Sequence, residues 1–150
     1  MEKATARAYL KAIYSHEEEG NETTTLSIAR ILRVKPASVS EMLGKLAEEG
    51  YVKHLPYRGV SLTDTGRLEA KRSVRKQRIM ETFLSKMLGL PEGEAIKQAE
   101  ELHKSLSDEA DEKLCMLMKR PMRSVRDKEI PHCGKKMSCE SCLALGSKRA

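Results

Sequence analysis

The hydrophobic pattern of residues 25–49 predicts two short helices that meet at a tight turn. In the first helix, the apolar residues share one face and follow threonines that can cap its start. In the second helix, apolar side chains recur at i, i+3, i+4 and i+7 from Val39 to Leu46. Pro36 suits the first turn of this helix, because the N–H that proline lacks would have no helical partner there. Gly50 is typical of a residue that ends a helix.

After these two helices the apolar pattern changes from a helical to an alternating period. Residues 51–55 alternate as a strand does, residues 56–59 have the composition of a turn, and residues 60–62 predict a return strand. Two helices followed by a two-stranded wing form a module that reads DNA. Short polar and basic side chains on the outer side of the second helix can bond base edges or phosphates, and Arg58 lies at the hairpin tip. The predicted DNA-binding residues are Lys35, Ala37, Ser38, Ser40, Glu41, Lys45 and Arg58.

An amphipathic helix is predicted on either side of this module. The first covers residues 3–19, and we expect its acidic end at residues 17–19 to be solvated. The second begins at Thr63 or Asp64 and continues to Leu88, where a Gly-Leu-Pro sequence gives a strong stop signal. Because its first half is basic and its second half apolar, this helix would carry the reading head at one end and an association surface at the other.

Two shorter helices are predicted further along the chain. One covers residues 92–105, and the other follows Ser107, which can cap its start. Together with the apolar half of the long helix, they are too small to bury their apolar faces alone. We therefore predict a homodimer, which would present two reading heads to a palindromic double-stranded DNA operator.

The composition agrees with a helical core and a basic DNA-binding surface. The 150 residues include one Phe, four Tyr and no Trp, so the core must be built from aliphatic side chains and eight Met. The net charge of +6 is unevenly spread, because residues 25–78 hold twelve basic and five acidic side chains, whereas residues 92–112 hold two basic and eight acidic ones. Phosphate contacts release counterions, so binding should weaken steeply with salt.

These patterns predict a mainly α fold in three parts. They are a winged helix-turn-helix DNA-binding domain at residues 1–72, a helical dimerisation domain at residues 73–120 and a short Cys-rich metal-binding tail at residues 121–150.

Several protein classes are excluded by features that the sequence lacks. No apolar run approaches the ~18 residues of a membrane span, and residues 1–3 lead directly into a helix, so we expect a cytoplasmic protein with no membrane partner. The sequence has no glycine-rich phosphate loop. Its four His, at positions 16, 54, 103 and 132, are scattered without a nucleophile, so we predict no enzyme activity.

Several motifs, taken in order, resemble the metal-dependent repressors of the diphtheria-toxin-repressor and manganese-repressor family, over about 120 of the 150 positions. The resemblance implies a winged-helix head, a helical dimerisation domain and a divalent Fe or Mn corepressor. On this resemblance, we expect the SH3-like domain of the longer family members to be absent. The motifs are AYLKAIY at 8–14, PASVSEMLGKL with GYV within 36–52, YRGVSLTDTGR at 57–67, LGL at 88–90 and HKSLSDEADEKL at 103–114.

The ligand positions that the resemblance implies are only partly filled by metal-binding residue types. A protonated amine does not ligate a cation and would repel it, so Lys at two of these positions speaks against a complete site. We expect the ordinary corepressor site to be broken, with Glu81, Glu100 and His103 as the donors that survive. The family positions fall at Ala8, Lys11, Gln77, Glu81, Glu100, His103 and Lys104.

Cysteines near the end of the chain offer a different metal site. Cys133, Cys139 and Cys142 form a Cys-x5-Cys-x2-Cys pattern, and Cys115 precedes them in a helix. Four thiolates suit tetrahedral Zn²⁺ or a [4Fe–4S] cluster, and three thiolates with His132 suit zinc. Free thiols are the alternative, but three cysteines within ten residues are unusual in a chain otherwise poor in cysteine.

Together these observations predict a homodimeric DNA-binding transcriptional regulator, a repressor of metal, iron or redox homeostasis controlled by the cysteine site. Two alternatives stay open. One is a classical Mn²⁺- or Fe²⁺-dependent repressor that binds its ion through Glu81, Glu100 and His103. The other is a zinc-stabilised interaction module whose winged helix binds a protein.

Overall fold

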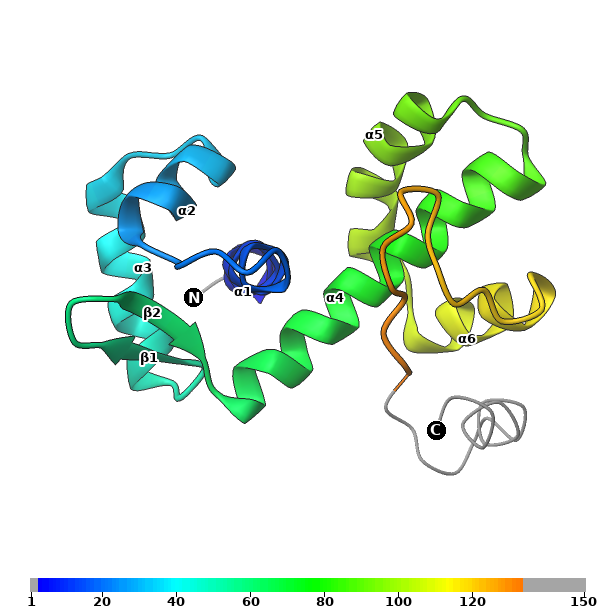
Figure 1. The fold of residues 1–150 in the computed structure, drawn as a ribbon. Helices are drawn as coiled ribbons and strands as arrows, with labels where there is room; N and C mark the ends of the chain where they lie inside the picture. Colours follow the sequence, from blue (N-terminus) through cyan, green and yellow to red (C-terminus); the bar gives the residue numbers. More distant parts are fainter. Residues whose placement is uncertain (1–2, 134–150) are drawn as a thin grey trace. The chain divides into compact units, whose positions relative to one another are not determined.

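The structure is a computed structural model in which residues 3–133 are described (Figure 1). It divides into two compact units, residues 1–74 and residues 75–150. The prediction of a mainly α fold with a winged helix-turn-helix module is confirmed, whereas residues 134–150 of the predicted cysteine tail lie outside the described residues. The first unit contains α1 (Lys3–Glu18), α2 (Thr25–Leu32), α3 (Pro36–Glu48), β1 (Val52–Leu55), β2 (Gly59–Leu62) and the start of α4 (Asp64–Thr82).

Local sequence signals fix the helix ends of the first unit. Thr24 caps α2 by accepting a hydrogen bond from Ser27 N at 3.1 Å, and the Ser27 hydroxyl accepts from Thr24 N at 2.9 Å. This reciprocal capping box satisfies two N–H groups that the first helical turn leaves without partners. The Thr63 hydroxyl accepts from Gly66 N at 3.1 Å, so Thr63 caps α4.

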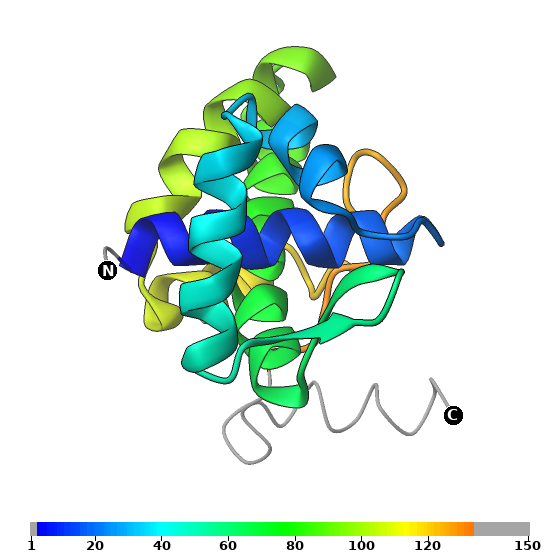
Figure 2. The ribbon, with the colours of Figure 1, turned by 90° about the vertical axis from the view of Figure 1, so that its left-hand side faces the viewer.

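The core of the first unit collects the apolar stripes of its helices and the inner face of its hairpin. Figure 2 shows α3 crossing over α1 in this unit. The strands are antiparallel, with Val52 opposite Leu62 and His54 opposite Val60. The largest fully buried side chains here are Leu10, Ile13, Ile28, Val39, Leu43 and Leu46.

The sequence led us to expect a solvated acidic end for α1, but Glu17 at this end is engaged in contacts. Glu17 accepts hydrogen bonds from Leu62 N at 3.1 Å and from Arg67 Nη2 at 2.6 Å. Its side chain is only 18% exposed. The expectation was wrong for Glu17, because its two partners lie 45 and 50 residues away along the chain, whereas Glu18 and Glu19 are exposed. Glu17 therefore ties α1 to β2 and to the start of α4.

The second unit is built on the C-terminal part of α4. The predicted helical run to Leu88 ends in a π-helical turn, η1 (Phe83–Met87), instead of continuing as α-helix. Next come α5 (Glu92–Leu102), the 3₁₀ turn η2 (His103–Ser105) and α6 (Asp108–Leu117). The Ser107 hydroxyl accepts from Ala110 N at 3.1 Å, which confirms the predicted cap.

Two apolar clusters lie against α4 in this unit. Met80 and Leu84 pack with Ala95 and Ala99 of α5, while Ile79 packs with Cys115 of α6 and with Ile130. The residues after α6 therefore fold back onto α4.

Candidate nucleic-acid interface and metal-binding residues

The outer side of α3 carries the side chains that we predicted to contact DNA. Burial of Val39, Leu43 and Leu46 fixes the rotation of the helix about its axis. All six predicted residues on and before α3 are exposed, and they are Lys35, Ala37, Ser38, Ser40, Glu41 and Lys45. The structure thus leaves this side of the helix accessible to a ligand.

Two of the predicted DNA-binding residues on this surface form an ion pair with each other. Lys45 Nζ lies 2.7 Å from Glu41 Oε1, one helical turn away. The hydrogen bond and the opposite charge lower the pKa of Glu41 and raise the pKa of Lys45. A phosphate that recruits Lys45 would compete with Glu41 for the same ammonium group.

The wing presents Arg58 beside an aromatic ring that the sequence analysis treated only as a turn residue. Both Arg58 and Tyr57 are exposed, and Tyr57 has a φ of +60°. The backbone closes the turn through Arg58 N, which donates to Leu55 O at 3.1 Å. In the sequence, the signal for this second candidate contact is the tyrosine of the Pro-Tyr-Arg-Gly turn, because residues at a hairpin tip are usually exposed.

The base of the wing is anchored to the loop before α2. Val60 N donates to Thr23 O at 2.9 Å. A Cβ added at Gly59 would lie 2.1 Å from that same oxygen, so only glycine permits this approach. Backbone contacts therefore hold the base of the hairpin against the loop before α2.

Several basic side chains of α4 are engaged within the protein. Arg75 and Arg78 are 5% and 4% exposed. Lys76 Nζ lies 2.8 Å from Asp108 Oδ1, and Arg67 is held by Glu17. A count of charges along the sequence cannot show that these cations serve internal carboxylates and carbonyls.

Arg75 belongs to a buried pair within the second unit. Its Nε donates to Asp111 Oδ2 at 2.7 Å, and its Nη1 donates to Pro131 O at 2.9 Å. Burial raises the pKa of the Asp111 carboxyl, against the opposing pull of Arg75. Burial lowers the pKa of Arg75, but the charge and hydrogen bonding of Asp111, with a contribution from Cys115, outweigh it, so the pKa is raised.

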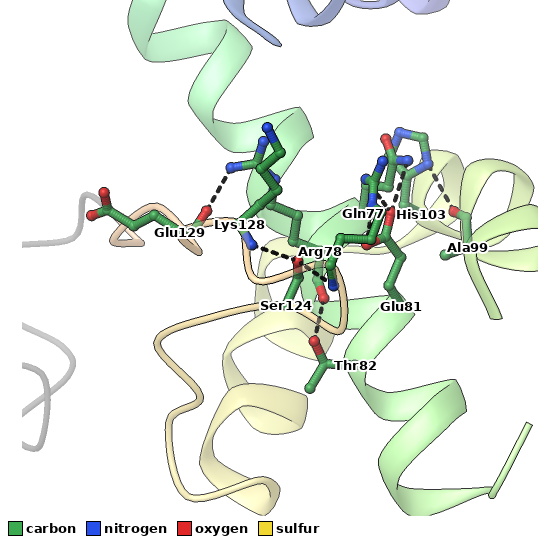
Figure 3. A network of polar contacts seen from close by, with 10 residues as sticks. Gln77, Arg78, Glu81, Thr82, Ala99, His103, Ser124, Lys128 and Glu129 are labelled. Atoms are coloured by element: carbon green, nitrogen blue, oxygen red, sulfur yellow. Dashed lines mark hydrogen bonds and ion pairs between the residues drawn. The ribbon is translucent and has the colours of Figure 1, made fainter. Parts of the chain in front are cut away.

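Glu81 lies within a polar cluster formed by α4, α5 and the segment after α6 (Figure 3). Its side chain is 0% exposed. Gln77 Nε2 donates to Glu81 Oε1 at 3.1 Å. Arg126 donates through Nη2 to Oε1 at 2.7 Å and through Nε to Oε2 at 3.3 Å. The carboxylate is thus paired with a bidentate guanidinium.

The other two surviving donors, Glu100 and His103, come from α5 and from η2. His103 is buried, and its Nδ1 lies 3.0 Å from Ala99 O, a bond in which the ring nitrogen donates. Glu100 is half-buried on α5. In residues 3–133, no group of three or more His, Cys, Asp or Glu side chains is placed to hold a metal ion.

The comparisons with known proteins cover nearly the whole described chain. Residues 2–60 match the N-terminal DNA-binding domain of the iron dependent repressors, and residues 63–132 match their metal binding and dimerisation domain. An uncharacterised HTH-type transcriptional regulator of Methanocaldococcus jannaschii, MJ0568, is 39% identical over 75% of this chain and 90% of its own length.

The chain belongs to the iron-dependent repressor family.

Two further relatives of this repressor-family chain are longer proteins. The diphtheria toxin repressor of Corynebacterium diphtheriae is 31% identical over 85% of this chain and 56% of its own length. A solved structure described as a manganese-dependent transcriptional repressor in complex with manganese has a TM-score of 0.79 and 34% identity, and covers 85% of this chain and 58% of its own. The chain therefore spans somewhat more than half of these relatives. As the relatives are regulators of transcription, this repressor-family chain is not an enzyme.

The family description implies a metal in the second unit, but the residues of this repressor-family chain do not fit one at Glu81. Both Glu81 oxygens are bonded to Arg126, and the neighbouring family position is Gln77, an amide. Lys104, at another family position, is paired with Glu101 at 2.9 Å. A cation would have to displace a guanidinium and would gain few hard oxygen ligands.

The cysteine candidates fall partly inside and partly outside the described residues. Cys115 is 3% exposed, between Ile79 and Ile130. The Sγ of Cys133, which is half-buried, lies 3.8 Å from Nδ1 of His132. Cys139 and Cys142 lie outside the described residues.

None of the helices within residues 3–133 is both long enough and apolar enough to span a membrane.

Proposed function

We propose that this chain is a transcriptional repressor that binds operator DNA through the exposed side of α3 and the tip of the wing. The observation that carries the proposal is the exposure of Lys35, Ser38 and Ser40 on a helix whose other side is fixed by a buried core. This geometry supports insertion of α3 into a major groove, with Arg58 reaching a neighbouring phosphate or minor groove. The match of residues 2–60 to a DNA-binding domain supports the same assignment.

We further propose that the repressor acts as a homodimer on a palindromic operator. Large apolar side chains are exposed in the second unit, where Leu88 is 60% exposed and Leu102 is 47% exposed. They come from the end of η1 and from α5, two elements that pack against each other. Exposed apolar groups of this kind support association with a second copy, and a two-fold axis would place two α3 helices on two half-sites.

The signal that controls binding is a separate proposal. The family description and the relatives support regulation of iron or manganese homeostasis. For this chain we propose a [4Fe–4S] cluster or Zn²⁺ held by Cys115, Cys133, Cys139 and Cys142, with His132 as the substitute ligand. The closeness of the Cys133 thiol to the His132 imidazole supports a site that uses both donor types.

A salt titration of the full chain on duplex DNA tests the DNA-binding proposal. We expect the logarithm of affinity to fall linearly with the logarithm of salt concentration, with a slope of several units that reflects the phosphates contacted. Arg58→Ala should weaken binding and reduce the slope by about one, measured by fluorescence anisotropy. Operator titration should give two chains per duplex.

Lys113→Ala is the matched control, because Lys113 is 73% exposed on α6 of the second unit. Its affinity and slope should equal those of the parent chain. A flat salt response would contradict the proposal and favour the zinc-stabilised protein-interaction module instead.

A further inference from the structure

The second unit contains a fully buried carboxylate whose charge requires a partner. Glu81 lies on α4 with 0% of its side chain exposed. An ionised carboxylate without a counter-charge is strongly disfavoured away from water. The described residues show how this chain meets that requirement, since Arg126 supplies a positive charge from within the same chain.

The contact between Arg126 and Glu81 has the geometry of a strong ion pair. Two guanidinium nitrogens face the two carboxylate oxygens, at 2.7 Å and 3.3 Å. A fork-to-fork arrangement fixes direction as well as charge, which a lysine ammonium cannot do. Gln77 adds a third donor at 3.1 Å. The carboxylate is therefore both neutralised and hydrogen-bonded.

Hydrogen bonds other than the ion pair already hold the segment that carries Arg126. The buried Ser124 hydroxyl accepts from the backbone N–H groups of Arg126 and Lys128, both at 3.3 Å. Ser124 N donates to Lys128 O at 2.8 Å, which closes the turn. Asp127 adopts a left-handed φ of +55° within it.

The end of this turn at Glu129 and Ile130 is held against α4, and it is bonded back to Met122 at the start of the turn. Arg78 Nη1 donates to Glu129 O at 2.6 Å, and Figure 3 shows this bond beside the Ser124 turn. Ile130 is 2% exposed, and its N–H donates to Met122 O at 2.9 Å. Arg126 is thus offered to Glu81 by a preorganised turn, so little further conformational freedom is lost when the pair forms.

We infer that Arg126 is a built-in cation that occupies the place of a divalent metal at Glu81, so the second unit keeps its structure without one. A guanidinium stays charged throughout the physiological pH range and cannot dissociate from the chain. A free ion would have to break a bidentate pair to reach Glu81, and it would meet the amide of Gln77 in place of the histidine that the family resemblance implies there. Metal supply therefore does not act on this repressor through Glu81.

The test measures thermal unfolding of the full chain, without DNA, in the presence of a chelator and with added Mn²⁺ or Fe²⁺. The decisive quantity is the part of any metal-induced shift in Tm that is lost in Glu81→Gln. We expect this part to be zero, because no ion reaches Glu81 in the parent chain. A Tm that rises with Mn²⁺ in the parent but not in Glu81→Gln would overturn the inference.

A set of variants tests whether the ion pair itself holds the unit. Arg126→Gln should lower Tm by roughly 5 °C, because it leaves Glu81 buried without its counter-charge. Arg126→Gln combined with Glu81→Gln should recover most of that loss. Arg126→Lys keeps the charge without the fork and should lie between, which provides a folded variant if Arg126→Gln does not fold.

Arg123→Gln is the matched control, because it removes the same charge from the same turn at a side chain that is 61% exposed. Its Tm should stay close to that of the parent. Equal losses in Arg123→Gln and Arg126→Gln would overturn the inference. Because every readout is stability, failure here is distinguishable from failure of the DNA-binding proposal.

Discussion

Single residues set the close contacts that hold the reading head together. At the start of α4, a Cβ added at Gly66 would lie 1.9 Å from Tyr51 O, the oxygen that accepts from Thr63 N at 3.0 Å. The backbone of the long helix can approach the start of the wing only because this position lacks a side chain. A glycine elsewhere in a helix, such as Gly44 in α3, has no atom within 4 Å of the added Cβ.

These two glycines give opposite predictions for the same substitution. Gly66→Ala should destabilise the protein by about 1–3 kcal/mol, because backbone must shift to admit the methyl group. Gly44→Ala should stabilise it by up to about 1 kcal/mol, because alanine favours the helix. Urea unfolding followed by circular dichroism measures both changes, and equal effects of the two substitutions would contradict the steric argument.

At the scale of elements, α4 carries several basic side chains that serve the folded protein. Arg75 and Arg78 reach Asp111, Pro131 and Glu129 of the second unit. Helical periodicity predicted where this helix begins, and it did not reveal which of its charges are buried. The π-helical turn at its end was likewise hidden, because the apolar spacing of residues 79–88 is compatible with a continuous α-helix.

The buried Arg75 and Asp111 pair leads to a stability prediction for this element. Asp111→Ala leaves Arg75, whose side chain is 7% exposed, without its counter-charge. We expect a loss of about 3–5 kcal/mol in the free energy of unfolding. Lys113→Ala on the same helix, at an exposed pair, should cost less than about 1 kcal/mol. Similar losses for both substitutions, measured by denaturant unfolding, would show that burial is not the reason.

At the scale of the whole molecule, the residues of the second unit bear on where a regulatory signal enters. The family description places a metal in the second unit, while the described residues of this chain pair Glu81 with an arginine. We therefore propose that the four cysteines form the site at which the regulatory signal acts. A thiolate site would link α6, through Cys115, to the chain beyond residue 132.

Metal analysis of the chain, purified without oxygen, tests this proposal. We expect either iron with labile sulfide and absorption near about 400 nm, or one zinc per chain without colour. Cys139→Ser should reduce the metal content, because it removes a thiolate ligand. Glu81→Gln is the control and should leave it unchanged. A metal-free parent chain that still binds operator would contradict control by the cysteines.

The sequence by itself determined the order of the α-helices and strands and the exposed side of α3. Apolar period, caps and turn residues act over a few positions, so Thr24, Pro36, Gly50 and Ser107 could be interpreted directly. The family resemblance rested on short motifs of the same kind, and the comparisons confirm it.

Only the tertiary structure decided which charges are partners. Glu17 with Arg67 and Glu81 with Arg126 are joined across 50 and 45 residues. Such pairs leave no local period, because they depend on how distant elements pack and not on what lies beside them in the chain. The sequence showed that several family ligands are missing. Only the structure showed that Arg126 pairs with Glu81, the carboxylate that remains.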